Sequence, residues 1–301
     1  MKIMNHFNVD CVLDIKANLG ESPIWSTKDQ MLYWVDINNH LICKFYPKDK
    51  KNSVINVGDF IGCFALKKNL NIVLALTNGF FELEQKNEKI TFLCNPKDNN
   101  PENRFNDGTV DLKGRFYAGT MSLKPTNKGE EPKGNLYCLY PSGDVKKILE
   151  GFYTINGLAF SPDYKTAYVS DSAPWIRTIW SYDYDLEEGV WSNKKVFFET
   201  HGINGRPDGG CVDADGCYWM AGVSGWELVR ITPTGKIDMV IRMPIEKPTK
   251  IAFGGSKLDT MYVTSIGKDI TQGTIKKQPK AGGIFALTIP GIKGIDFPFY
   301  G

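Results

Sequence analysis

A short motif recurs six times along this chain, and its spacing constrains the fold more than any other feature. Each copy begins with a turn rich in Asp, Asn, Lys or Gly and continues into a short β-prone strand. The copies occupy residues 27–36, 67–76, 111–120, 162–171, 213–222 and 256–265. Matching positions fall roughly 40 to 50 residues apart, the length of a four-stranded propeller blade, at Tyr33, Ile72, Phe116, Tyr168, Tyr218 and Tyr262.

The rest of the sequence supports an all-β fold. Helical periodicity is almost absent, and short apolar or alternating runs are separated by clusters of Gly, Pro, Asn and Asp. A β-sandwich needs only about seven to nine strands, too few for this many turns, and a single barrel gives no reason for the repeat. We therefore predict a six-bladed β-propeller with a central metal-binding channel, built as one domain from residues 1–301.

Composition and charge narrow the possible partners. The net charge of +2 is near balance and no basic stripe is present, so we expect no nucleic-acid partner. No apolar run approaches membrane-spanning length, and the first residues lack the apolar core of a signal peptide. The seven cysteines are scattered without a CxxC, which favours free thiols in a cytoplasmic protein, although Cys211 and Cys217 could face each other across a hairpin. The oligomeric state stays open.

The strand that precedes each repeated turn carries unusual polar residues. In a propeller blade this first strand lines the central channel and pairs with the second through a hairpin. Four oxygen-bearing side chains lie 12, 10, 12 and 10 residues before the matching positions of their blades: Glu21, Asn106, Asn156 and Asp208. Because side chains alternate along a strand with period two, even offsets predict that all four share one face and converge on the channel.

Two carboxylates and two amides brought together favour a bound cation. The carboxylates repel each other unless a cation or a shared proton lies between them. Oxygen ligands suit one divalent metal ion such as Ca²⁺, Mg²⁺ or Mn²⁺, and Zn²⁺ also fits if three protein ligands bind. Asn-Gly and Asp-Gly are also common turn dipeptides, so a purely structural role for each residue remains open.

Around these residues the chain strongly resembles the SMP-30/gluconolactonase/regucalcin-like family, particularly its bacterial sugar lactonases. The resemblance runs nearly end to end, through GESPIW (20–25), NRFNDGTVD (103–111), GRFYAGTM (114–121), INGLAFSPD (155–163), GRPDGGCVDADGCYW (205–219) and AFGGSKLDTMYVTS (252–265). It implies a six-bladed propeller whose divalent metal is held by Glu21, Asn156 and Asp208. It also implies that Arg104 and Asn106 contact the substrate.

One departure from that family concerns the substrate. Animal members carry an acidic residue that meets the sugar hydroxyls shortly after the GTM segment. Here Ser122, Leu123 and Lys124 stand in that place, and the acids Glu130 and Glu131 come later. This difference leaves the identity of the sugar open and does not affect the predicted metal ligands.

The resemblance implies a metal-dependent sugar lactonase. We expect it to hydrolyse a gluconolactone-, xylonolactone- or arabinonolactone-like aldonolactone, with the metal polarising the carbonyl and Asp208 acting as the general base. Two rivals remain: a phosphotriester or ester hydrolase that uses the same site, and a Ca²⁺-binding regulatory protein.

Several neighbouring residues receive predicted roles from their position alone. Arg104 lies two residues before Asn106, hence on the same strand face, whereas Asp107 points the other way and is expected to satisfy a turn. The polar segment 122–133 is interpreted as a loop that covers the site, with an idle surface loop as the alternative. Trp175 and Trp226 are candidates for apolar walls or for simple packing.

Overall fold

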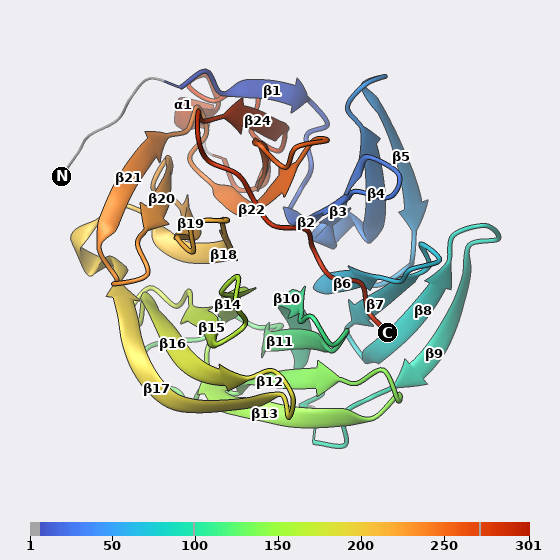
Figure 1. Ribbon diagram of the computed structural model, residues 1–301. Helices are drawn as coiled ribbons and strands as arrows, with labels where there is room; N and C mark the ends of the chain where they lie inside the picture. Colours follow the sequence, from blue (N-terminus) through green and yellow to red (C-terminus); the bar gives the residue numbers. More distant parts are fainter. Residues whose placement is uncertain (1–6, 99, 271) are drawn as a thin grey trace.

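The six repeated segments form the second strand of six antiparallel sheets arranged in a ring (Figure 1). The computed structural model describes residues 7–98, 100–270 and 272–301. Within that range every sheet has four strands, and in five of them the strands are consecutive in sequence. The predicted six-bladed β-propeller is confirmed.

The strand bounds follow the repeat closely. The first blade contains β2 (Gly20–Ser26), β3 (Met31–Asp36), β4 (Leu41–Tyr46) and β5 (Lys51–Asn56). The second contains β6 (Cys63–Leu66), β7 (Ile72–Leu76), β8 (Gly79–Glu84) and β9 (Lys89–Cys94). The third contains β10 (Asn103–Val110), β11 (Phe116–Ser122), β12 (Gly134–Leu139) and β13 (Val145–Phe152).

The second half of the chain repeats the arrangement. The fourth blade contains β14 (Ile155–Phe160), β15 (Thr166–Asp171), β16 (Thr178–Asp185) and β17 (Val190–Glu199). The fifth contains β18 (Arg206–Val212), β19 (Tyr218–Val223), β20 (Glu227–Ile231) and β21 (Ile237–Arg242). The sixth contains β22 (Pro248–Gly254), β23 (Thr260–Ser265), β24 (Ile284–Thr288) and the N-terminal strand β1 (Asp10–Leu13). Three short helices complete the described elements: η1 (Ile37–Asn39), η2 (Thr200–Gly202) and α1 (Gln272–Ile275).

The sixth blade closes the ring with strands from both halves of the chain. β1 pairs antiparallel with β24, placing Asp10 opposite Ala286 and Cys11 opposite Phe285. The repeat did not reveal this pairing, because the partners lie near opposite ends of the sequence. A propeller closed in this way holds its first and last blades together through backbone hydrogen bonds rather than side-chain packing alone.

The hydrophobic core lies between neighbouring blades, and the matching positions of the repeat contribute to it. All six of these side chains are buried. The rings of Tyr168 and Tyr218, from adjacent blades, lie with centroids 5.2 Å apart, and Trp25 stacks on Tyr262 at 5.4 Å across the first and sixth blades. Aromatic residues recur at this position because each blade must fill the wedge between itself and its neighbour.

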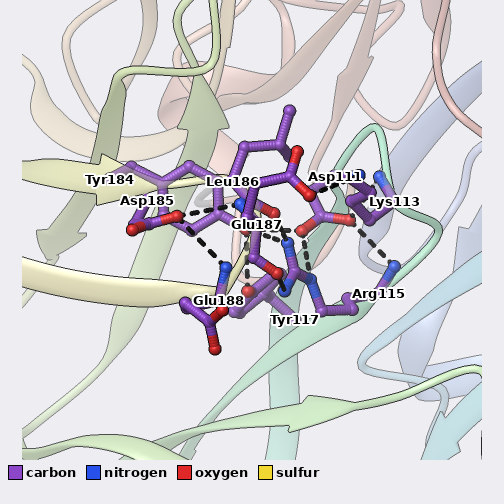
Figure 2. A network of polar contacts seen from close by, with 9 residues as sticks. All are labelled: Asp111, Lys113, Arg115, Tyr117, Tyr184, Asp185, Leu186, Glu187 and Glu188. Carbon is purple, nitrogen blue, oxygen red and sulfur yellow. Dashed lines mark hydrogen bonds and ion pairs between the residues drawn. The ribbon is translucent and has the colours of Figure 1, made fainter.

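A buried polar network ties the third blade to the fourth (Figure 2). Asp111, which follows β10, is completely buried and accepts a hydrogen bond from Arg115 Nε at 2.6 Å and another from the Tyr184 hydroxyl on β16. Arg115 also donates to the backbone carbonyls of Leu186 and Glu187 in the β16–β17 turn. The two buried charges of the network, Asp111 and Arg115, are therefore paired with each other, as burial requires.

The described chain contains no disulfide. Cys211 lies opposite Trp219 in the hairpin register, not opposite Cys217, and all seven cysteines are free. In the described part of the chain, no helix has both the length and the apolar character that crossing a bilayer requires.

Candidate functional site

The five predicted site residues line a single cleft among the innermost strands. The cleft has a volume of about 350 Å³, within the usual range for small-molecule sites. Its polar lining includes Glu21 from β2, Asn156 from β14 and Asp208 from β18. Arg104 and Asn106 from β10 lie in the same cleft. Strands of four different blades therefore bring these side chains together, while the functional roles assigned to them stay predictions.

An irregularity in each innermost strand that carries one of these side chains aims it into the cleft. The pairing register shifts between Glu21 and Ile24, between Asn156 and Ala159, and at the corresponding points of β10, β18 and β22. Such bulges interrupt the alternation of side chains and redirect them locally. Simple period-two counting back from the second strand therefore does not explain the convergence. The residues converge because the same bulge recurs in each of these blades.

A chain of hydrogen bonds fixes the amide groups of the cleft. Arg104 Nη1 donates to Asn106 Oδ1 at 2.9 Å, and Asn106 Nδ2 donates to Asn156 Oδ1 at 3.1 Å. Asn156 Nδ2 in turn donates to Ser172 Oγ at 2.7 Å, and Ser172 Oγ donates to the Pro207 carbonyl. This chain orients the amide oxygen of Asn156 and leaves that oxygen with a further lone pair. Asn106 thus positions Asn156 through direct contact.

The two carboxylates of the cleft are buried with few hydrogen-bond donors. Glu21 and Asp208 are each 7% exposed, and Glu21 Oε2 accepts from the backbone N–H of Ser22 at 2.8 Å. Burial, with a further contribution from Asp107, raises the pKa of Glu21 to about 7. Burial and the proximity of Glu21 raise the pKa of Asp208 well above its ordinary value. In the metal-free protein both carboxyl groups therefore resist ionisation, because water cannot solvate their charge.

This donor set fits a divalent cation. Two carboxylates and one oriented amide oxygen supply three oxygen ligands, the chemistry that hard divalent ions prefer. Among the described residues no group of three or more His, Cys, Asp and Glu side chains has a metal-binding arrangement. The predicted set has only two such residues and takes its third ligand from Asn156, so it falls outside that pattern.

Below the cleft, Asp107 forms a buried ion pair rather than satisfying a turn. Its carboxylate accepts hydrogen bonds from Lys250 Nζ on β22 and from the backbone N–H of Leu158 on β14 at 2.9 Å. Lys250 Nζ also donates to the Gly108 carbonyl at 3.0 Å. The lysine passes so close to Gly209 that a Cβ there would lie 2.4 Å from it. Asp107 therefore has a structural role, as predicted, but that role is to link three blades rather than to satisfy a turn.

Three further cleft residues were not singled out by their position in the sequence. Ser172 holds Asn156, and Arg206 and Lys268 line the cleft. Arg206 lies two residues before Asp208, so its place in the GRPDGG motif was a usable signal. Ser172 and Lys268 offer no comparable signal, because nothing in their local sequence distinguishes them from surface residues.

The structure places part of segment 122–133 and one of the two candidate tryptophans at the cleft, while their roles stay predictions. Thr126, within segment 122–133, lines the cleft, and residues 122–126 line an adjoining cavity of about 340 Å³. Trp175 also lines the cleft. Trp226 does not, since its ring instead packs against the guanidinium of Arg242, 5.3 Å from the ring centroid.

The metal-free protein is expected to lose stability as the pH rises from about 4.5 to about 7, the interval between the ordinary and folded-state pKa of Glu21. Across this interval the folded protein holds a proton that the unfolded chain releases, so rising pH favours unfolding. Urea unfolding in chelator at several pH values measures the effect. Glu21→Gln, which cannot ionise there, should give a flatter profile. Identical profiles for the two proteins would contradict the assignment.

Comparison with known proteins places this site in a family context. The profile of the SMP-30/Gluconolactonase/LRE-like region matches residues 19–267, which include all five predicted site residues. The chain belongs to this family.

Individual relatives of the SMP-30/gluconolactonase family match nearly the whole chain. Regucalcin of Xenopus laevis is 38% identical over 295 residues, covering 97% of this chain and 98% of its own. A luciferin-regenerating enzyme is 28% identical with a TM-score of 0.90, covering 98% of this chain and 99% of its own. A structure described as a calcium-binding protein, regucalcin from Agrobacterium tumefaciens, has a TM-score of 0.92 at 24% identity, with both chains fully covered. The last likeness concerns the fold alone.

Proposed function

We propose that this protein is a metal-dependent sugar lactonase that hydrolyses an aldonolactone to the aldonic acid. The observation that carries the proposal is the pair of buried carboxylates, Glu21 and Asp208, in one cleft with the oriented amide oxygen of Asn156. Membership of a family whose description includes gluconolactonase supports the reaction class. Seven free cysteines support a cytoplasmic location.

Glu21, Asn156 and Asp208 would hold the divalent cation, and their oxygen ligands suit Ca²⁺ as one candidate. A cation bound there supplies Lewis acidity that polarises the lactone carbonyl. The remaining catalytic work falls to the side chains of the cleft. Asp208 accepts the proton of the attacking water and returns it to the ring oxygen as the C–O bond breaks.

Arg104 and Asn106 are proposed to bind the sugar from the side of the third blade. Arg104 uses Nη1 for the Phe105 carbonyl and Asn106, which leaves guanidinium donors for substrate oxygens. Both Nδ2 hydrogens of Asn106 are engaged, with Ile155 and Asn156, so Asn106 offers the substrate its carbonyl oxygen alone. Arg104 is therefore the stronger hydrogen-bond donor to the sugar.

Restoring metals one at a time tests the proposal. Protein stripped with a chelator is mixed with gluconolactone, xylonolactone or arabinonolactone, and proton release is followed as Ca²⁺, Mg²⁺, Mn²⁺ or Zn²⁺ is added singly. We expect hydrolysis well above the spontaneous rate with at least one ion. In chelator we expect the rate to equal the spontaneous one. Rates that never exceed the spontaneous one with any ion would refute the lactonase.

Two other outcomes identify the rival functions. Preferential hydrolysis of a paraoxon-like phosphotriester would assign the same site to a different ester class. Tight Ca²⁺ binding by calorimetry without turnover of any lactone or ester would favour a calcium-binding regulatory protein, in line with the names of the regucalcin relatives.

A further inference from the structure

The cleft carries three cationic side chains that form no ion pair among the described residues, although Arg104 and Arg206 lie within electrostatic reach of Glu21 and Asp208. Arg104, Arg206 and Lys268 all line it and are half-buried. Arg104 donates only to the Phe105 carbonyl and the Asn106 amide, and Arg206 only to the Ser172 carbonyl at 3.3 Å. Across residues 7–98, 100–270 and 272–301, none of the three forms an ion pair.

The two most buried arginines of the described chain, Arg115 and Arg230, are paired with acids. Arg115 Nε lies 2.6 Å from Asp111 Oδ2, as Figure 2 shows, and Arg230 forms ion pairs with three aspartates at 2.7 to 2.8 Å. Partial removal from water is costly for a guanidinium that lacks a counter-charge. The half-buried Arg177 also lacks an acid, but its Nε and Nη2 are engaged by the hydroxyl and backbone carbonyls of the segment that it clamps. Arg104 and Arg206 donate through Nη1 alone, so their other guanidinium donors and their charge are available to a ligand.

The charge balance of the cleft leaves this positive charge uncompensated. Its acidic lining consists of Glu21 and Asp208, and the adjoining cavity around residues 122–126 adds no acidic side chain. Both carboxylates are committed to a divalent cation under the proposed function, which cancels their charge. Arg104, Arg206 and Lys268 then confer a net positive potential on the space beside the lactone.

Arg206 is held in place before any ligand binds. The segment that leads into it is clamped by Arg177, whose Nη2 donates to the carbonyls of Ile203 and Gly205 at 3.0 and 2.9 Å. Nη1 of Arg206 donates to the backbone carbonyl of Ser172, the residue whose hydroxyl also orients Asn156. A guanidinium fixed at its base with free donors is suited to bidentate recognition of a planar or tetrahedral anion.

We propose that Arg206, acting with Arg104, binds an anionic substituent of the substrate, so that the preferred substrate is a sugar lactone bearing a carboxylate or a phosphate group. This inference rests on the proposed lactonase function and specifies its substrate class. The reaction is unchanged: water adds across the acyl–oxygen bond, and the substituent takes no part in bond making.

Three lactones that share one ring test the inference: neutral glucono-1,5-lactone, its 6-phosphate, and the corresponding lactone of glucaric acid. We expect kcat/KM for at least one anionic lactone to exceed that for the neutral one by about tenfold or more. The anionic lactone that is preferred identifies the substituent as carboxylate or phosphate. Raising the salt concentration should diminish the preference.

Substitution of Arg206 supplies the residue-level test. Arg206→Gln should lower kcat/KM for the preferred anionic lactone by about 10- to 100-fold, mainly through KM, and lower kcat/KM for the neutral lactone by a clearly smaller factor. Arg206→Lys should recover part of the loss, because it restores the charge without the bidentate geometry. Arg242→Gln is the matched control, since Arg242 is exposed and lies outside the cleft.

Two results would overturn the inference while leaving the lactonase intact. One is a wild-type preference for the neutral lactone; the other is an equal loss on neutral and anionic lactones in Arg206→Gln. If no lactone is hydrolysed, the proposed function itself fails. Calorimetry on metal-loaded protein then tests the anion site separately from catalysis. Glucarate or 6-phosphogluconate binding more tightly than gluconate, with the difference abolished in Arg206→Gln, would support the site. Equal binding of all three acids would exclude it.

Discussion

Asp208→Asn is expected to lower kcat for lactone hydrolysis by about 100- to 10,000-fold, the range associated with loss of a general base. The substitution keeps the size of the side chain and one oxygen that can reach the cation, but removes the group that accepts the proton from water. Because the Asp208 carboxylate forms no ion pair with any residue that the structure describes, its neutral replacement should leave the fold intact. Steady-state kinetics at saturating metal measure the effect.

Two controls separate chemistry from metal loss. The metal content of the variant, measured after gel filtration in excess cation, should match that of the wild type, which would show that the site is filled. Asp49→Asn makes the same chemical change at an exposed position outside the cleft and should leave kcat unaltered. Wild-type turnover by Asp208→Asn would mean that another group acts as the base.

Lys250→Met is expected to reduce the free energy of unfolding by about 3–5 kcal/mol, because it leaves the Asp107 carboxylate buried without its counter-charge. Lys250 is 6% and Asp107 1% exposed, so water cannot replace the lost partner. Burial alone would lower the pKa of the Lys250 ammonium, but Asp107 raises it above the ordinary value, so the ammonium is charged near neutral pH. Urea unfolding in chelator measures the loss.

A double-mutant comparison isolates the pair. Asp107→Asn combined with Lys250→Met removes both charges and should be less destabilised than the sum of the two single variants. Lys113→Met, at an exposed ion pair with Glu187, should cost less than about 1 kcal/mol. A Lys250→Met protein as stable as the wild type would show that the pair makes no net contribution.

Local sequence patterns were sufficient to predict the architecture. The recurring turn and β-prone strand encode hairpins, which depend on near neighbours only, and the spacing of Tyr33, Phe116 and Tyr168 encodes the blade length. The ring closure by β1 was not predictable in this way. A four-residue strand whose partner, β24, lies at the far end of the chain has no local signature, and its pairing depends on the curvature accumulated over all the blades.

The sequence by itself determined that Glu21, Asn156 and Asp208 recur at related positions of different blades, since a repeat maps sequence position onto position around an axis. Only the tertiary structure decided how these side chains are aimed and what surrounds them. The bulges in β2, β14 and β18 set their direction. The partners of Lys250 and Arg206 come from other blades. A lysine or arginine in a strand looks like a surface residue until the chain closes around it, because burial and unpaired charge are properties of the assembled ring.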